Sequence, residues 1–387
     1  MGEINLNNKR NVGIYIHVPF CLSKCHYCDF CSVQRADEDK KERYTVRLCE
    51  EITTFAEKIR ENGDVPVADT VYFGGGTPTL LSPEQISRVL GAVKTNFGIS
   101  EGAEITIETN PKSADGEKLR NIRAAGVNRL SIGMQSIHDR ELKALGRIHN
   151  FSDFKSTFSK AREAGFDNIS VDLMYGIPVQ TKESFCQSVK TLAEVGPEHI
   201  SSYCLTVEDG TNFGRRRDSL TLPDEDTVAD MCAEMECILS QNGYHKYEIS
   251  NFSKEGKESR HNLKYWHCDG YLGFGAAAHS YFGGKRFAHS RDIDAYIEGE
   301  SIIIDVEDIS QSEAQNEYVM LGMRLAEGVC LADFKGKFGS ELLSEFPSFK
   351  KYAPEFVKID GERCAFSEKG MMVSNFILSD VLDFGKD

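Results

Sequence analysis

The sequence predicts an α/β fold: a partial (β/α)6 barrel, followed by a C-terminal α+β extension and a small helical, winged-helix-like domain. Three observations lead to this prediction. Six short runs rich in β-branched and apolar residues alternate with longer helix-like stretches, polar turns separate the runs, and the alternation ends after about residue 208. Strands that are each separated by a helix form a parallel sheet, and right-handed crossovers curve such a sheet toward a barrel.

The elements follow one another in a regular order. The expected strands cover residues 13–18, 70–75, 104–109, 128–134, 168–175 and 199–207. The helix-like stretches between them cover residues 38–61, 83–96, 114–125, 139–146 together with 152–164, and 182–195. An open, doubly wound sheet has the same alternation and is the alternative that the pattern leaves open.

Three regions are expected along the chain. The barrel covers residues 10–208, an extension covers 209–299, and a small C-terminal domain covers 300–387. The barrel ends where the strand–helix alternation gives way to a polar, turn-rich segment. The extension is marked by an aromatic and histidine-rich stretch from Tyr244 to Tyr281. The helical pattern that follows, with short apolar pieces near its end, is typical of a winged-helix-like domain.

Composition and charge exclude several classes of protein. The formal net charge is −15 at pH 7, and because phosphate binding needs a basic surface we expect no nucleic-acid partner. The polar stretch MGEINLNNKRNVG has no signal-peptide core, and no apolar run is long enough to cross a bilayer. We therefore expect a cytoplasmic protein without stable membrane insertion. In that compartment the 12 cysteines are not expected to form disulfides.

Three cysteines, Cys21, Cys25 and Cys28, lie within eight residues of one another, just after the first expected strand. Iron–sulfur clusters are normally held by four thiolates, so a cluster on three thiolates leaves one iron open to another ligand. The alternative is a zinc site that adds His26 or Cys31. Zinc sites normally show a second, distant pair of ligands, and the sequence has no such pair.

A glycine-rich turn and several polar residues follow the expected strands at their C-terminal ends. In a barrel of this type, active sites are built at that edge. The turn Gly74-Gly75-Gly76-Thr77 follows the second strand, where glycines let a ligand approach the backbone, although an ordinary connection has the same composition. Carboxylates at this edge can bind ribose hydroxyls, and an arginine can bind a carboxylate. The polar residues are Glu108, Gln135, Arg147, Asp172 and Thr206.

The spacing Cys-x-x-x-Cys-x-x-Cys, with Tyr27 before the last cysteine, resembles the radical S-adenosylmethionine (SAM) superfamily. The resemblance implies a 4Fe–4S cluster on Cys21, Cys25 and Cys28, whose open iron is chelated by the amino and carboxylate groups of SAM. It also implies that the glycine-rich turn faces SAM. A larger residue at Gly76 is then expected to weaken SAM binding while the cluster stays in place.

Further segments narrow the resemblance to the HemW family of haem chaperones, which are relatives of the oxygen-independent coproporphyrinogen III oxidase HemN. These segments are YIHVPFC, YFGGGTPT, IETNP, SIGMQS, LGRIH, DLMYGIP, YEISNF and RHNLKYW. Phe30 stands where HemN has a cysteine, and Cys31, one place later, is expected to be a buried thiol. The resemblance implies a SAM site formed by Tyr15, Tyr27, Gly75, Gly76, Thr77, Glu108, Gln135, Arg147, Asp172 and Thr206.

Residues 261–266 match the HNxxYW motif of the HemW family, and the resemblance implies that they take part in haem binding. Histidine is a common axial ligand of haem, so His261 is the candidate ligand, with Tyr265 and Trp266 as stacking rings. Judged without the resemblance, the same residues fit a structural role, with His261 hydrogen-bonded in the core. The axial ligand stays open because other histidines lie close by: His245, His267, His279 and His289.

The function that the resemblance implies is that of a haem chaperone, which carries a 4Fe–4S cluster and SAM and binds haem as its cargo. Its expected partners are haem, haem-accepting proteins and an electron donor for the cluster. The alternative is a HemN-like coproporphyrinogen III oxidase, or another radical SAM reaction on a tetrapyrrole. Phe30 and the HNxxYW motif favour the chaperone, so we expect no coproporphyrinogen oxidase activity.

Overall fold

The computed structural model describes residues 11–300 and 303–382. Within these residues one sheet of twelve strands forms the framework, in the order β14-β13-β12-β11-β1-β4-β5-β6-β7-β8-β10-β9. The six central strands run parallel. They are β1 (Asn11–Val18), β4 (Val67–Gly75), β5 (Ile99–Thr109), β6 (Arg129–Gln135), β7 (Ile169–Tyr175) and β8 (His199–Cys204).

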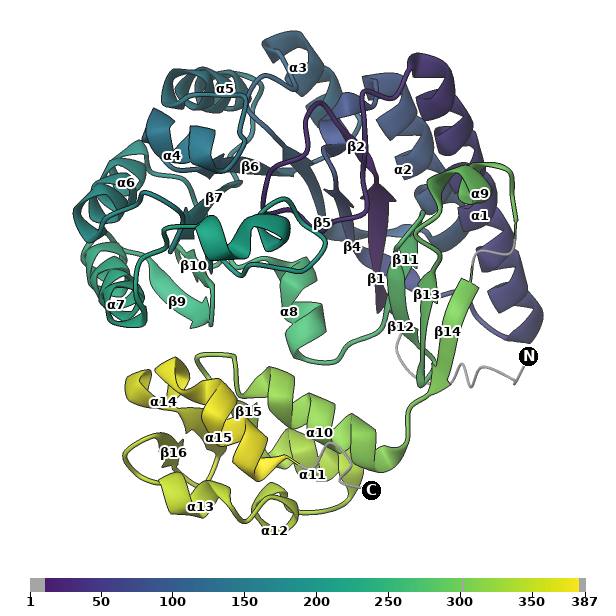
Figure 1. Cartoon of the computed structure of the whole chain (residues 1–387). Helices are drawn as coiled ribbons and strands as arrows, with labels where there is room; N and C mark the ends of the chain where they lie inside the picture. Colours follow the sequence, from purple (N-terminus) through teal and green to yellow (C-terminus); the bar gives the residue numbers. More distant parts are fainter. Residues whose placement is uncertain (1–10, 301–302, 383–387) are drawn as a thin grey trace.

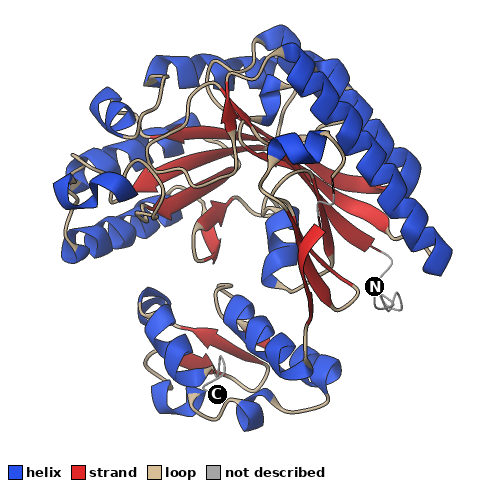
Figure 2. Ribbon diagram, turned by 45° about the vertical axis from the view of Figure 1, so that its right-hand side comes forward, coloured by secondary structure: helices blue, strands red, loops and turns tan. Residues whose placement is uncertain are grey.

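The helices that connect these strands cover the convex outer face of the curved sheet (Figure 2). Since crossovers that all pass on one face close a sheet toward a barrel, the predicted partial (β/α)6 barrel is confirmed rather than the doubly wound alternative. The helices are α1 (Glu38–Asn62), α2 (Pro83–Phe97), α3 (Gly116–Ala124), α4 (Asp139–Ala144), α5 (Phe151–Glu163) and α6 (Lys182–Val195), with the short helix η1 (Pro78–Leu80) after β4.

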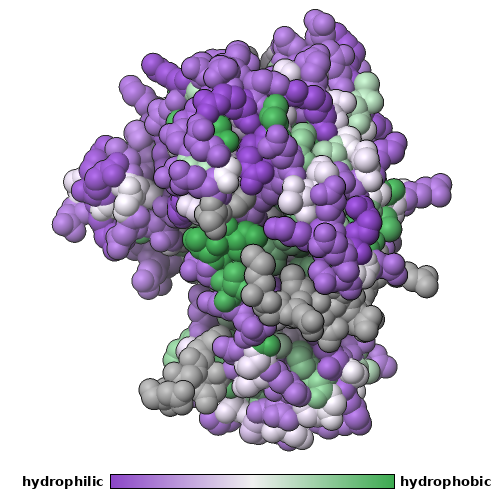
Figure 3. All heavy atoms as spheres, turned by 90° about the vertical axis from the view of Figure 1, so that its right-hand side faces the viewer, coloured by the Kyte–Doolittle hydropathy of each residue, from purple (hydrophilic) through white to green (hydrophobic). Residues whose placement is uncertain are grey.

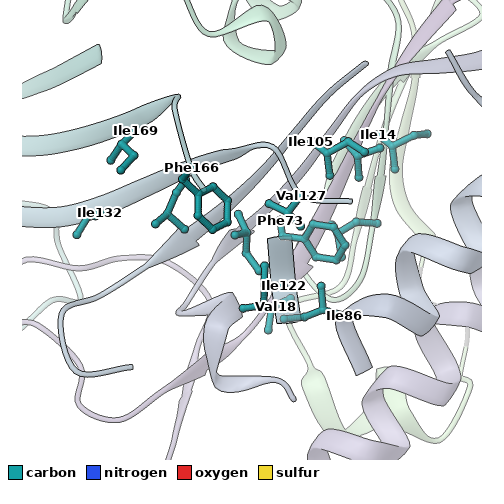
Figure 4. Close-up of a cluster of buried hydrophobic side chains, with 14 of the residues drawn as sticks. Ile14, Val18, Phe73, Ile86, Ile105, Ile122, Val127, Ile132, Phe166 and Ile169 are labelled. Carbon is teal, nitrogen blue, oxygen red and sulfur yellow. The ribbon is translucent and has the colours of Figure 1, made fainter. Parts of the chain in front are cut away.

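The hydrophobic core lies between the sheet and these helices. In β1 the side chains of Ile14, Ile16 and Val18 are fully buried, because successive residues of a strand point to opposite faces and these three point to the helices. Figure 4 shows Phe73 of β4 near Ile86 of α2. The apolar side of the six strands is therefore their outer side.

The inner side of the same strands is polar. Thr70, Arg129, Ser131 and Ser170 are almost fully buried there. Closed barrels fill this space with branched apolar side chains, whereas here hydroxyl and guanidinium groups surround a cavity. Because buried polar groups need hydrogen-bond partners, this interior suits a polar ligand.

The region expected as a separate extension instead lengthens the barrel sheet at both edges. At one edge β10 (Asn251–Ser253) and β9 (His245–Glu248) follow β8, packed beside α7 (Glu225–Gln241), and η2 (Gly214–Ser219) precedes them in the chain. At the other edge β11 pairs in parallel with β1, and an antiparallel ribbon continues from it. Its strands are β11 (Tyr271–Phe274), β12 (His279–Phe282), β13 (Lys285–His289) and β14 (Ile303–Asp308), with α9 (Ile293–Ile297) before β14.

The C-terminal unit lies below the barrel in Figure 1 and has a hydrophobic core of its own, which includes Phe334 and Phe349. Its small antiparallel sheet has the order β15-β17-β16. The elements are α10 (Gln311–Gly322), β15 (Val329–Cys330), α11 (Leu331–Phe338), α12 (Leu342–Glu345), α13 (Phe349–Tyr352), β16 (Val357–Ile359), β17 (Arg363–Phe366), α14 (Glu368–Met372) and α15 (Ser374–Val381).

The structure therefore differs from the domain boundaries that we expected. The boundary near residue 300 falls too early, because β14 pairs with β13 and belongs to the large sheet. The compact C-terminal unit begins with α10. Residues 10, 301–302 and 383–387 of the expected domains lie outside the described residues.

Helix α8 (Arg260–Trp266) lies beneath the barrel and contacts both β4 and α10 (Figure 1). Its first turn is held by Glu104 of β5, whose two carboxylate oxygens accept hydrogen bonds from the backbone N–H groups of Arg260 and His261, each at 3.1 Å. These N–H groups have no partner within the helix itself. The Glu104 carboxylate thus accepts their hydrogen bonds, and its negative charge stabilises the positive N-terminal end of the helix dipole.

We predict that Glu104→Ala destabilises the fold by about 1–3 kcal/mol, because it leaves the buried N–H of His261 and the part-buried N–H of Arg260 without an acceptor. Chemical unfolding measures this difference. The matched control is Glu101→Ala, which removes an exposed carboxylate from the same strand and should leave stability nearly unchanged. Equal effects of the two substitutions would show that Glu104 does not hold α8.

Candidate functional site

A cavity of about 440 Å³ opens at the C-terminal ends of the barrel strands and continues into the polar interior. This volume is typical of sites that bind small molecules and cofactors. Most of the residues expected at the SAM and cluster sites line it together: Cys21, Cys25, Tyr27, Cys28, Gly75, Gly76, Glu108, Gln135, Arg147, Asp172 and Thr206.

The cysteine-bearing loop is anchored at several points. It begins with β2 (Phe20–Cys21), which pairs with β3 (Val33–Gln34). In the middle of the loop the backbone N–H of His26 donates to the carbonyl of Leu145 at 2.9 Å, and His26 Nδ1 lies 3.1 Å from the Ala144 carbonyl oxygen. These bonds tie the loop and the ring of His26 to the end of α4.

The three thiols fit a cluster better than a single metal ion. No three His, Cys, Asp or Glu side chains within residues 11–300 and 303–382 come close enough to share one ion. A cluster does not require this, because each thiolate binds a different iron. Burial raises the pKa of the Cys21 and Cys28 thiols. Cys31 lies outside the cavity and donates to the Arg291 carbonyl at 3.2 Å, so a fourth ligand for zinc finds no support.

Gly75 and Gly76 line the cavity on one side and pack on the other against β1 and the start of the cysteine loop. Gly75 has a φ of +104°, and a Cβ at this position would lie 2.5 Å from the ring of His17. A Cβ at Gly76 would lie 2.6 Å from the backbone oxygen of Phe20. A larger residue at Gly76 would therefore displace the cysteine loop, which corrects our expectation that such a residue leaves the cluster in place.

Thr77 does not line the main cavity. Its backbone N–H donates to the Phe20 carbonyl at 2.7 Å, and its hydroxyl accepts from Asn110 Nδ2 at 2.8 Å. Asn110 Oδ1 in turn accepts from Arg147 Nη2 at 2.6 Å. Thr77 therefore positions Asn110 and Arg147 at the rim and does not face the cavity directly.

Two carboxylates face the cavity from neighbouring parts of the sheet. Glu108 accepts a hydrogen bond from the Tyr72 hydroxyl at 2.8 Å, and Asp172 accepts one from the Ser131 hydroxyl at 3.2 Å. Removal from bulk water raises the pKa of Glu108 to about 7 and the pKa of Asp172 to about 6. Because a cationic or hydroxyl-bearing ligand stabilises the ionised forms, both residues suit the ammonium, sulfonium and ribose groups of SAM.

Two arginines bring donors to the same cavity. Arg147 Nη2 also donates to the Gly133 carbonyl at 2.5 Å, and Arg147 Nη1 lies 3.5 Å from Cys25 Sγ. Arg129 is 2% exposed and lies deeper in the barrel. Among the described residues, the Nε atoms of both arginines are buried without a hydrogen-bond partner. Unsatisfied donors of this kind fit a carboxylate ligand, so the residues present are compatible with SAM.

Tyr15 lies beneath the cavity and not in its wall. Its ring stacks on Tyr72 at a centroid distance of 6.3 Å and lies near His261 at 6.5 Å. Its hydroxyl bonds to His17 Nδ1 at 3.1 Å. In this structure Tyr15 therefore supports Tyr72, which is itself part of the wall.

The HNxxYW residues occupy a structural position. His261 is 1% exposed, with Nδ1 at 2.8 Å from the Thr70 hydroxyl and Nε2 at 2.9 Å from the Tyr265 hydroxyl. Burial lowers the pKa of His261 to about 3. Since both ring nitrogens have partners, His261 can ligate haem iron only after it leaves them. Trp266 lies at the other end of α8, against the C-terminal unit.

Several cavity residues were missed in the sequence. They are Tyr72, Asn110, Arg129, Ser131, Ser201, Tyr203 and Asn262. For those on strands, a signal existed: alternation along each strand places them on the same side as Glu108 and Asp172. No local signal identifies Asn262, because α8 reaches the cavity only through the folding of the extension.

Comparison with family models supports the resemblance. The model of the radical SAM superfamily matches residues 15–192, and the model of the HemN C-terminal domain matches residues 309–373. Within residues 11–300 and 303–382, no helix combines the length and the apolar composition required to cross a bilayer.

Curated relatives cover most of the chain. The "Heme chaperone HemW" of Bacillus subtilis is 37% identical over 93% of this chain and 96% of its own length. The protein of the same name from Escherichia coli is 33% identical over 84% of this chain and 85% of its own length. A mouse protein, "Radical S-adenosyl methionine domain-containing protein 1, mitochondrial", is 41% identical over 70% of this chain and 60% of its own length.

Among solved structures, coproporphyrinogen III oxidase (HemN) from Escherichia coli superposes with a TM-score of 0.84. The match covers 97% of this chain and 91% of the oxidase, at 23% sequence identity. At this identity the match establishes a common fold and leaves activity open.

The raised pKa of Glu108 predicts a pH-dependent stability. The pKa of Glu108 is about 7 in the folded protein, whereas an exposed glutamate has a pKa of 4.5. Between these values the folded protein keeps a proton that the unfolded chain has lost. The contribution of Glu108 to stability is therefore complete below pH 4.5 and is lost as the pH rises through 7. We expect Glu108→Gln, measured without SAM, to gain on the order of 2 kcal/mol relative to wild type between pH 5 and pH 8. Chemical unfolding at both pH values tests this, with Glu101→Gln as the control. A constant difference between variant and wild type would contradict it.

Proposed function

This chain belongs to the HemW family of the radical SAM superfamily, and on this basis we propose that it is a haem chaperone that carries a 4Fe–4S cluster and SAM and delivers haem to haemoproteins. The observation that carries the proposal is the 37% identity to a curated haem chaperone across 96% of that protein's length. Similarity of this extent covers the barrel, the extension and the C-terminal unit together.

The cavity supports the cofactor part of the proposal. Cys21, Cys25 and Cys28 would hold the cluster, whose open iron would take the amino and carboxylate groups of SAM. When bound, the cluster supplies the electron with which superfamily members cleave the sulfonium of SAM. Arg147 would donate to the SAM carboxylate, while Glu108 and Asp172 would accept from its cationic and hydroxyl groups.

The alternative function is that of a coproporphyrinogen III oxidase. The common fold with HemN allows it. Phe30 argues against the oxidase, because it occupies the position of a HemN cysteine and is 63% exposed at the mouth of the cavity.

The partners that we propose are haem-accepting proteins and an electron donor for the cluster. The location that we propose for the protein is the cytoplasm.

For the cluster, we predict that Cys21→Ala, Cys25→Ala and Cys28→Ala each lose most of the bound iron after anaerobic reconstitution, because each removes one of three thiolate ligands. Cys31→Ala is the matched control and should keep wild-type iron content. Iron and sulfide analysis with the absorption spectrum measures both. Loss of the cluster from Cys31→Ala, with Cys21→Ala still loaded, would contradict the ligand assignment.

For the function, we predict saturable haem binding by the reconstituted wild-type protein and no conversion of coproporphyrinogen III to protoporphyrinogen in the presence of SAM and a reductant. Spectroscopic titration and product analysis measure the two. A wild-type protein without saturable haem binding would end the chaperone proposal. Formation of protoporphyrinogen would instead establish the oxidase.

A further inference from the structure

A second cavity, of about 790 Å³, lies between the large sheet and the C-terminal unit. It shares no lining residue with the cavity at the cysteines. One wall is the turn of the β12–β13 hairpin with Tyr281 and Phe282, and the opposite wall comes from α10 and α11 with Tyr318 and Gly336. The molecule narrows to a waist between its two parts, and Figure 3 shows hydrophobic side chains gathered there.

The imidazole of His267 lines this cavity, at the C-terminal end of α8. Among the residues that the structure describes, no hydrogen-bond partner lies at its ring, and the side chain is only partly exposed. The HNxxYW motif holds it in place: Lys264 Nζ forms an ion pair with Asp69 Oδ1 at 2.8 Å, and His261 bonds to Thr70. The motif therefore fixes the helix whose end presents His267.

The other histidines of the extension do not combine these properties. His245 is paired with Glu258 at 2.8 Å. His289 is buried, with Nδ1 at 3.2 Å from the Ala278 carbonyl oxygen and Nε2 beside Glu51. His261 has partners on both nitrogens, as described above. His279 is exposed on β12 and lines neither cavity.

We propose that haem binds in this second cavity, with the His267 imidazole as an axial ligand of the iron and with Tyr281, Phe282 and Tyr318 against the porphyrin. This inference rests on the proposed chaperone function and names the site at which the cargo is held. It places haem away from His261, whose role is then to anchor α8.

The size of the cavity and its aromatic residues suit haem. Its volume lies within the usual range for sites that bury a cofactor, and aromatic rings on both walls can pack against the flat macrocycle. Neutral imidazole is a standard iron ligand. The neighbouring Cys268 also lines the cavity. Lys337 also lines the cavity, with its Nζ 4.6 Å from the centroid of the Tyr318 ring. Because Asp64, Asp269 and Asp333 share the lining, a bound haem would direct its propionates to Lys337 or to solvent.

The test is a haem titration of the reconstituted full chain and two pairs of variants. His267→Ala removes the ligand, and His245→Ala, which removes a histidine outside the cavity, is its control. Gly336→Leu fills the cavity from α11, where an added Cβ meets open space, and Gly91→Leu is its control in α2, where a Cβ also meets open space. Since a helical glycine is replaced in both, neither leucine should destabilise its helix.

We expect His267→Ala and Gly336→Leu each to weaken haem binding by about tenfold or more, while both controls match wild type. His267→Ala should also shift the Soret band, and added imidazole should restore the wild-type spectrum. If wild type binds haem and both His267→Ala and Gly336→Leu keep its affinity and spectrum, haem lies elsewhere and the inference is overturned. If only Gly336→Leu weakens binding, the His267 ligand is overturned. If wild type binds no haem, the chaperone proposal itself fails.

Discussion

The capping of α8 by Glu104 is the interaction on which the two cavities depend. A carboxylate on a central barrel strand accepts the first two N–H groups of this short helix, and a helix of this length is not stable by itself in water. Once fixed, α8 closes the lower end of the barrel, brings Asn262 to the inner cavity and carries His267 to the second cavity. The helix that carries the HNxxYW motif thus contributes residues to both cavities.

The polar interior of the barrel imposes a second constraint. Glu108 and Asp172 are removed from bulk water and their pKa values are raised, while the Nε atoms of Arg129 and Arg147 have no hydrogen-bond partner among the described residues. Such an arrangement costs stability in the protein alone. A ligand with both cationic and anionic groups offsets that cost, and a zwitterionic sulfonium such as SAM carries both.

The sequence predicts the site best where its residues are local or periodic. Cys21, Cys25 and Cys28 lie in one loop, and the strand-end residues Glu108 and Asp172 follow from the position of their strands, so both groups reach one cavity as expected. Thr77 and Tyr15 support the wall instead of forming it, because their hydroxyl groups bond to Asn110 and His17 within the protein. Whether a residue forms the wall or supports it depends on where its side chain points and what it bonds to. Spacing along the chain does not reveal either.

By itself the sequence determined the parallel strands, their helices and the cysteine loop, since periodicity and short spacings specify contacts between residues close along the chain. Only the tertiary structure decided that residues 209–308 extend the barrel sheet at both edges, that both nitrogens of His261 are occupied, and that His267 faces a cavity. Several of these features depend on contacts between residues more than 150 positions apart, such as Glu104 with Arg260 and Thr70 with His261. No local pattern encodes such pairs, because their geometry exists only after the sheet has closed around α8.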